Sequence, residues 1–203
     1  VQAAVPLVCQ STVAAFEPSY MTVGLPCDAA GRLTAAAIDE VIQLAESATA
    51  VALGPGLGRS EKLTQLADQL YRQIARPMVV DADALNALSE HPAALEGAGG
   101  ARVLTPHPGE FGRLVAQTQE SPVELAARIR AIVVLKGHQT EVTDGRQSYR
   151  NTTGNPGMAT GGSGDVLTGL VTALICQGLS PWDAARLGVH LHGLSGDLAA
   201  AEL

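Results

Sequence analysis

The chain has 203 residues, of which 46% are hydrophobic and 16% charged, and its formal net charge is −7. This length and composition suit one compact domain with a sizeable core and exclude a disordered chain. An acidic chain without runs of Lys or Arg argues against nucleic acid or an anionic membrane as a partner. No apolar run is long enough to span a bilayer, and three scattered cysteines favour a reducing, cytoplasmic compartment.

Short apolar strands alternate with amphipathic helices along the chain. Strands are expected at residues 5–13, 20–26, 50–53, 78–80, 102–105 and 131–135, and helices are expected to begin near Thr34, Ser60, Asp81 and Pro122. Residues 141–143 and 148–150 predict a β-hairpin around Asp144-Gly145. An apolar helix follows from Val166, and the sequence Ser180-Pro181-Trp182-Asp183 is typical of a capping box that starts the last helix. The alternation predicts a single α/β domain with a mostly parallel sheet covered on both faces.

Polar or glycine-rich motifs follow four of these strands. They occupy residues 54–58, 81–86, 105–110 and 136–140. In parallel α/β sheets, ligands bind beyond the carboxyl ends of the strands, so these motifs are expected to meet at one site.

A glycine-rich turn leads into the apolar helix at residues 161–178. Gly161, Gly162 and Gly164 allow close approach to an oxygen-rich ligand, and the free amides at a helix start favour an anion. Asp165 follows in the first helical turn. A carboxylate beside an anion site is interpreted as a general base that takes a proton from a hydroxyl near a phosphoryl group. The alternative is an acid that only stabilises the helix start.

Residues 54–58 and 81 also suggest a dinucleotide-binding loop followed by a ribose-binding acid, Asp81. The glycine spacing is not that of a Rossmann loop, and Pro55 removes one amide, so a tight strand-to-helix turn is the alternative.

His107 lies between two prolines after a predicted strand. Pro106 and Pro108 should stiffen this segment and prevent a helix from beginning there, so that His107 and Glu110 are presented from a loop. A ligand contact and a plain surface turn are the two interpretations.

Lys136 and Thr140 place a cation and a hydroxyl after another strand. They favour a contact with phosphate or ribose, and the alternative is a solvated loop. His190 and His192 are two residues apart on a helix and cannot face one metal, so we expect them to pack or lie on the surface. No metal-ligand spacing is present.

Taken together and in order, five segments resemble the NAD(P)H-hydrate dehydratase family of ribokinase-like domains. The segments are 54–58 (GPGLG), 81–86 (DADALN), 104–110 (LTPHPGE), 134–137 (VLKG) and 154–165 (GNPGMATGGSGD). The resemblance covers nearly the whole chain from Leu53 onward. It implies a three-layer αβα sandwich with a small β-hairpin.

The resemblance implies a cofactor-repair lyase that dehydrates the S epimer of hydrated NADH or NADPH, coupled to ADP or ATP, with Mg²⁺ as escort of the nucleotide. By motif, Asp165 would be the catalytic acid/base. The hydrate would be bound by Asp165 with Gly56, Gly58, Asn86, His107, Pro108, Gly109 and Glu110. The nucleotide would be bound by Lys136, Gly137, His138, Gln139, Thr140, Gly161, Gly162, Ser163 and Gly164. A homo-oligomer and a fused or separate hydrate epimerase are also implied.

Two departures and two rivals accompany this resemblance. The chain is expected to begin after a further glycine-rich segment of the family and to end before the family's extreme C-terminus. The rivals are a ribokinase-like kinase for a small alcohol and a non-catalytic nucleotide-binding module. The Pro-His-Pro-Gly-Glu segment together with Asp-Ala-Asp-Ala-Leu-Asn argues against the first rival, and Asp165 argues against the second.

Overall fold

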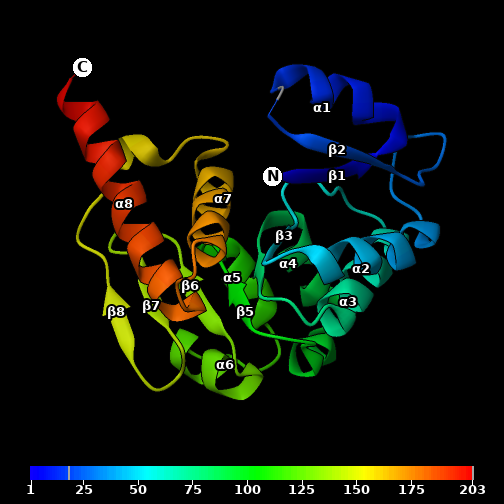
Figure 1. The fold of residues 1–203 in the computed structure, drawn as a ribbon. Helices are drawn as coiled ribbons and strands as arrows, with labels where there is room; N and C mark the ends of the chain where they lie inside the picture. Colours follow the sequence, from blue (N-terminus) through cyan, green and yellow to red (C-terminus); the bar gives the residue numbers. More distant parts are fainter. Residues whose placement is uncertain (18, 203) are drawn as a thin grey trace.

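The computed structural model describes residues 1–17 and 19–202 as two sheets and their covering helices (Figure 1). The small sheet contains β1 (Gln2–Pro6) and β2 (Met21–Leu25). The large sheet contains, in spatial order, β3 (Val51–Leu53), β4 (Met78–Val80), β5 (Arg102–Leu104), β6 (Ile132–Leu135), β7 (Glu141–Thr143) and β8 (Ser148–Arg150). The strands of the large sheet follow one another in the order of the chain.

The first four strands of the large sheet are parallel, and β6, β7 and β8 are joined as antiparallel pairs. The hairpin at 141–150 is therefore confirmed. Its turn contains Gly145 at φ +84°, a conformation that glycine adopts without steric cost.

Helices cover both faces of the large sheet. On one face lie α2 (Ile38–Ser47), α3 (Glu61–Gln73), α4 (Ala82–Glu90), α5 (Pro108–Leu114) and α6 (Pro122–Ile129), and on the other lie α7 (Ser163–Cys176) and α8 (Pro181–Ala201). Alternate residues of β4 are apolar on both faces, so that both faces need a covering layer: Met78 and Val80 pack into one core, and Val79 packs into the other. This is the expected three-layer αβα arrangement.

The N-terminal region differs from the sequence prediction. The strand expected at 5–13 ends at Pro6, and residues 7–16 form the 3-10 helix η1 (Leu7–Cys9) followed by α1 (Gln10–Phe16). The strands β1 and β2 pair only with each other, and Figure 1 shows them with α1, in blue, apart from the large sheet. The alternation of small and β-branched residues in this stretch does not distinguish strand from helix.

The prediction that Pro106 and Pro108 prevent a helix was wrong, because α5 begins at Pro108. Proline is tolerated at the first helical position, where its missing N–H has no intrahelical partner. His107 is the N-cap: its Nδ1 accepts hydrogen bonds from the amides of Gly109 (3.0 Å) and Glu110 (3.4 Å). A histidine N-cap is uncommon, and this explains why the sequence pattern did not reveal the helix.

Other helix starts follow the predicted capping. Ser60 Oγ accepts from the amide of Leu63, and Ser180 Oγ accepts from the amide of Asp183. Thr34 makes no side-chain cap and precedes the 3-10 helix η2 (Ala35–Ala37) instead. Two further 3-10 segments are η3 (Pro92–Gly97) and η4 (Pro156–Met158).

A buried arginine lies at the amino end of β5. Arg102 is 1% exposed, and its guanidinium donates to the carbonyl oxygens of Tyr71, Ile74, Arg76 and Ala101. Burial lowers the pKa of Arg102 to about 10, which leaves it charged at neutral pH. Three of these carbonyls, those of Tyr71, Ile74 and Arg76, lie at or just beyond the carboxyl end of α3, where helical carbonyls have no intrahelical partner.

Among residues 1–17 and 19–202, no helix combines the length and apolar character needed to cross a membrane.

Candidate active site

The four strand-end motifs meet at one edge of the large sheet. The amide of Asp81 donates to the carbonyl of Leu53, the amide of Thr105 to that of Val80, and the amide of Lys136 to that of Pro106 at 2.8 Å. These backbone bonds continue the ladders past the ends of β3 to β6. The motifs therefore lie side by side, as the parallel sheet predicted.

The glycine-rich turn lies at the start of α7. Gly162 is its N-cap, with φ at +88°, and Ser163 and Gly164 begin the helix. The first helical backbone bond runs from the amide of Val166 to the carbonyl of Gly162. Of the three helical amides before it, that of Ser163 donates to the carbonyl of Thr160 at 3.4 Å, and those of Gly164 and Asp165 are the ones that a helix start leaves for an anion. Asp165 lies in this first turn and is exposed.

Lys136 lies beneath that turn. Its Nζ is 2.7 Å from Oδ1 of Asp81, and a Cβ placed on Gly164 would lie only 3.0 Å from the same Nζ. Asp81 is 1% exposed and accepts a second hydrogen bond, also of 2.7 Å, from Oγ1 of Thr168 in α7. Lys136 is therefore not in a freely solvated loop, and its charge is paired with a buried carboxylate.

The glycine loop after β3 is tied to the start of α4. Oδ2 of Asp83 accepts from the amide of Gly58 at 2.9 Å, and its Oδ1 is 3.2 Å from Nε of Arg59. A Cβ on Gly54 would lie 1.8 Å from the carbonyl oxygen of Asp81, so only glycine allows this close approach. Gly56 is exposed at the tip of the loop.

Ala82 lies next to Asp81 with φ at +50°, a left-handed conformation that costs a non-glycine residue about 1–3 kcal/mol. A strained backbone conformation persists only where the surrounding structure holds it. Ala82 is held between the buried Asp81 and the first turn of α4.

His107 and Glu110 form a reciprocal capping box at the start of α5. Oε2 of Glu110 accepts from the amide of His107 at 2.9 Å, and Oε1 lies 3.5 Å from Nε2. The His107 ring is 53% exposed, whereas Glu110 is buried. The expected ligand-binding loop is thus a helix start whose imidazole is held in place. Pro108 and Gly109 form its exposed first turn.

Asn86 is buried in α4 and accepts a hydrogen bond of 2.9 Å from Nε of Arg113 in α5. Arg113 lies outside the sequence motifs. It places a cation between the motif at 81–86 and the helix that begins at Pro108.

The segment after Lys136 is an exposed turn. Oγ1 of Thr140 accepts from the amide of Gly137 at 3.3 Å and donates to its carbonyl at 3.1 Å. Gln139 has φ at +57°, and Gly137, His138 and Gln139 are exposed. The hydroxyl of Thr140 therefore stabilises the turn, and the three exposed residues are accessible to a ligand.

His192 packs against the start of α7 and so lies beside the glycine turn. Its Nε2 lies 3.4 Å from Oγ of Ser163. Burial lowers the pKa of His192, and the nearby charge of Lys136 lowers it further, against a hydrogen bond with Ser163 that raises it. The approach of α8 to the turn is a long-range contact that the sequence spacing did not reveal.

The segment leading into the turn is fastened to α8. Asp197 accepts hydrogen bonds from the amide of Gly154 (2.8 Å) and from Nδ2 of Asn155 (3.0 Å). A Cβ on Gly193 would lie 2.3 Å from Oγ1 of Thr153, so glycine in α8 lets the segment approach. Asp197 therefore helps to place the chain just before the glycine turn.

The residues at this edge fit a Mg²⁺ ion held mainly by phosphates. No group of three or more His, Cys, Asp or Glu side chains in residues 1–17 and 19–202 could enclose a metal. Both oxygens of Asp81 are occupied, which leaves the exposed Asp165 as the carboxylate nearest the turn. Mg²⁺ characteristically keeps waters and takes one or two carboxylates with substrate phosphates.

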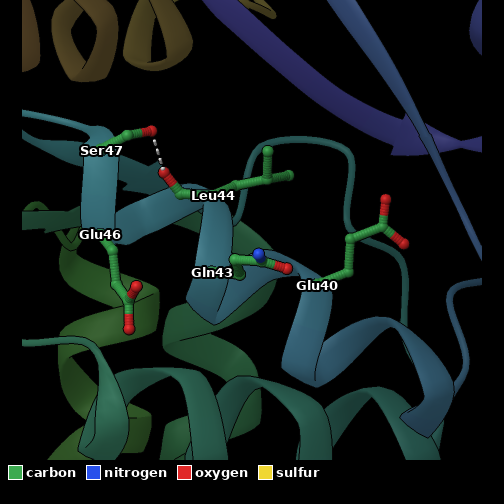
Figure 2. Close-up of a pocket in the computed structure, with 5 residues that line it drawn as sticks. All are labelled: Glu40, Gln43, Leu44, Glu46 and Ser47. Atoms are coloured by element: carbon green, nitrogen blue, oxygen red, sulfur yellow. Dashed lines mark hydrogen bonds between the residues drawn. The ribbon is translucent and has the colours of Figure 1, made fainter.

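A separate hollow lies over α2 and does not belong to this site. Figure 2 shows its lining, which comes entirely from one helix: Glu40, Gln43, Leu44, Glu46 and Ser47. The hydroxyl of Ser47 donates to the carbonyl of Leu44 at 3.0 Å within that helix. None of the residues expected to bind substrate or nucleotide contributes to it.

The helices packed on a mostly parallel sheet define a ribokinase-like α/β fold, in agreement with solved structures that resemble this chain. One is an ADP/ATP-dependent NAD(P)H-hydrate dehydratase from Bacillus subtilis, co-crystallised with ATP and Mg²⁺. It matches with a TM-score of 0.73 and 26% identity over 100% of this chain and 73% of that one. The family model for NAD(P)H-hydrate dehydratase matches residues 11–203, and the chain belongs to this family.

Curated relatives agree with the family match. The bifunctional NAD(P)H-hydrate repair enzyme of Moorella thermoacetica is 45% identical over 100% of this chain and 40% of its own length. The ADP-dependent (S)-NAD(P)H-hydrate dehydratase of Neisseria meningitidis is 42% identical over 75% of this chain and 55% of its own length. The chain thus spans about two fifths of the first relative and about half of the second.

Proposed function

We propose that this domain restores the S epimer of hydrated NADH or NADPH to the intact cofactor and couples the dehydration to ADP or ATP. The observation that carries the proposal is the exposed Asp165 carboxylate in the first turn of α7, directly after the glycine turn and above Lys136. Membership of the family and the names of the relatives support it.

The nucleotide would place its terminal phosphates over the amides of 161–164. Those amides and the helix start would stabilise the charge that develops on the transferring oxygens. Mg²⁺, when bound, would neutralise phosphate charge and orient the transferring group. Gly137, His138, Gln139 and Thr140 lie at the neighbouring strand end and would contact the rest of the nucleotide.

Asp165 would take the proton from the hydrate's hydroxyl as that oxygen attacks the terminal phosphorus. The bond from phosphorus to the nucleotide's bridging oxygen breaks, and a phosphate ester of the hydrate forms. The ring nitrogen then expels the phosphate, and loss of a proton from the adjacent ring carbon restores the double bond. The chain's task is to hold the hydroxyl, the base and the phosphorus in line.

The hydrate would lie between the glycine loop at 54–58 and the start of α5. Gly56 and Gly58 offer close backbone approach, and the held ring of His107 offers an apolar face. Asn86 and Glu110 support this region: Asn86 accepts a hydrogen bond from Arg113, and Glu110 accepts one from the amide of His107.

The direct test is recovery of dihydronicotinamide absorbance from S-hydrated NADH with ADP or ATP and Mg²⁺. We expect turnover that requires nucleotide; equal turnover without it would remove the coupled mechanism. A stable phosphorylated alcohol as product would favour a kinase. Asp165→Asn should reduce turnover by about 10²–10⁴ while ADP still binds, because asparagine cannot accept the proton. Asp144→Asn, on the distant hairpin, is the matched control.

We also propose cytoplasmic action, supported by three unpaired cysteines, Cys9, Cys27 and Cys176. An epimerase for the hydrate, fused or separate, would supply the S epimer, in keeping with the bifunctional relatives. A homo-oligomer stays a prediction from the family resemblance.

A further inference from the structure

We propose that Asp81 is a positioning residue for the nucleotide site and that it acts by holding the ammonium group of Lys136 beneath the glycine turn. The inference rests on the proposed function, because it concerns the same nucleotide. It adds a residue from β4's carboxyl end that contacts neither the substrate nor the reacting atoms.

Side chains from two different elements converge on the Asp81 carboxylate. Lys136, after β6, donates to Oδ1, and Thr168, in α7, donates to Oδ2, both at 2.7 Å. The carboxylate is 1% exposed and the Lys136 side chain 19% exposed, so water screens the pair little. Asp81 thus joins the sheet to α7 at the level of the glycine turn.

The pair also explains why residue 164 is glycine. A Cβ there would lie 3.0 Å from Nζ of Lys136 and 3.7 Å from Oδ2 of Asp81. The absent side chain lets the ammonium approach the backbone of the first turn of α7. Its positive charge then adds to the potential of the free amides, on the side away from solvent.

Two effects of removing the carboxylate oppose one another. Loss of a negative charge near the phosphates would strengthen binding if Lys136 stayed in place. An unpaired ammonium in a buried position is, however, unfavourable, and lysine has a flexible stem that reaches water. We therefore expect Lys136 to leave the turn in Asp81→Asn, and this second effect to prevail.

The experiment is a double-mutant cycle on ADP affinity, measured by calorimetry with Mg²⁺. Asp81→Asn should weaken ADP binding about tenfold in the chain that keeps Lys136, but less than about twofold when Lys136 is already methionine. Thr168→Val should weaken it by about threefold, and Thr168→Ser, which keeps the hydroxyl, should restore affinity. Melting profiles establish that each variant is folded.

The control is Asp68→Asn, which breaks a surface pair with Arg72 in α3, where the two groups lie 2.6 Å apart. It should leave ADP affinity unchanged. If Asp81→Asn lowers the melting temperature but not the affinity, or if it tightens binding, the positioning role is wrong. An equal loss with and without Lys136 would also overturn it, because Asp81 would then act by another route. Failure of the unmodified chain to bind ADP would instead refute the proposed function.

Discussion

Arg102 and Asp81 are buried charged residues at opposite ends of the strands of the large sheet, and their surroundings differ. At the amino end, Arg102 is surrounded by four carbonyl oxygens and by the ring of Tyr71, 5.1 Å from its guanidinium carbon. At the carboxyl end, Asp81 is paired with a lysine that lies under an exposed turn. Equal burial therefore does not imply an equal role.

The difference lies in what each charge is connected to. The guanidinium of Arg102 is bonded to backbone carbonyl oxygens, and those of Tyr71 and Ala101 also accept from the amides of Gly99 and Met78. Asp81 accepts hydrogen bonds from Lys136 and Thr168, and Lys136 lies beneath a helix start that faces solvent. A buried ionisable group marks a functional site only where its partners reach a place that a ligand can occupy.

The largest expected effect is on stability at the amino end. Arg102→Met should lower the free energy of unfolding by about 3–5 kcal/mol, because each carbonyl left without a donor costs about 1–3 kcal/mol. ADP affinity should be unchanged at a temperature where the variant is folded. Urea unfolding and calorimetry measure the two quantities, with Arg146→Met on the hairpin as control. If folded Arg102→Met lost ADP affinity, Arg102 would not differ from Asp81 in the way we describe.

Replacement of Lys136 by alanine should weaken ADP binding by about tenfold and slow the chemical step less. The ammonium supplies charge beneath the turn, whereas Asp165 supplies the proton acceptor. Single-turnover rates at saturating nucleotide separate the two effects. The exposed Lys62 of α3 provides the matched alanine variant, and equal affinity in both variants would restrict Lys136 to a structural role.

Asp197→Asn should reduce turnover by about two- to tenfold, since it weakens the tie between α8 and residues 154–155. The hydrogen bonds from the Gly154 amide and from Asn155 hold the pKa of Asp197 below its usual range. The tie is therefore present above about pH 4 and is lost as the pH falls below that value. The hydrogen-exchange rate of the Gly154 amide reports on its bond to Asp197. Unaltered protection of this amide in Asp197→Asn would contradict the role of Asp197 as the tie to α8.

The smallest effect concerns His192. Because burial lowers its pKa below about 6.5, the folded state disfavours the charged ring. The contribution to stability is full above that pH and is lost as the pH falls through the folded-state pKa. Melting temperatures between about pH 7.5 and 5.5 should therefore decline less in His192→Gln than in the unmodified chain. An identical decline would show that other groups cause it.

The sequence predicted the strands of the large sheet, most helices and the edge where the motifs meet, because these follow from local periodicity and from the parallel sheet, whereas the strand expected at 5–13 was wrong beyond Pro6. It missed α1 and α5, where small residues and a histidine cap gave no recognisable signal. It also missed the parts of the site that depend on distant pairs. Lys136 and Asp81 are 55 residues apart, and Thr168 and Asp81 are 87 apart. No local pattern records such contacts. Asp81 could be recognised from the sequence only as an acid at the end of a predicted strand.

The fastening of residues 154–155 to Asp197 also bears on how the protein is made. The chain up to Asp165 carries every motif of the proposed site, yet the anchor for its last segment lies more than thirty residues later, in α8. A ribosome adds about 5–20 residues per second, so this anchor follows the motifs by a few seconds. During that interval the nascent chain can form the parallel strands but not the fixed approach to the glycine turn. Completion of α8 would then be the step at which a newly synthesised molecule first gains its nucleotide site.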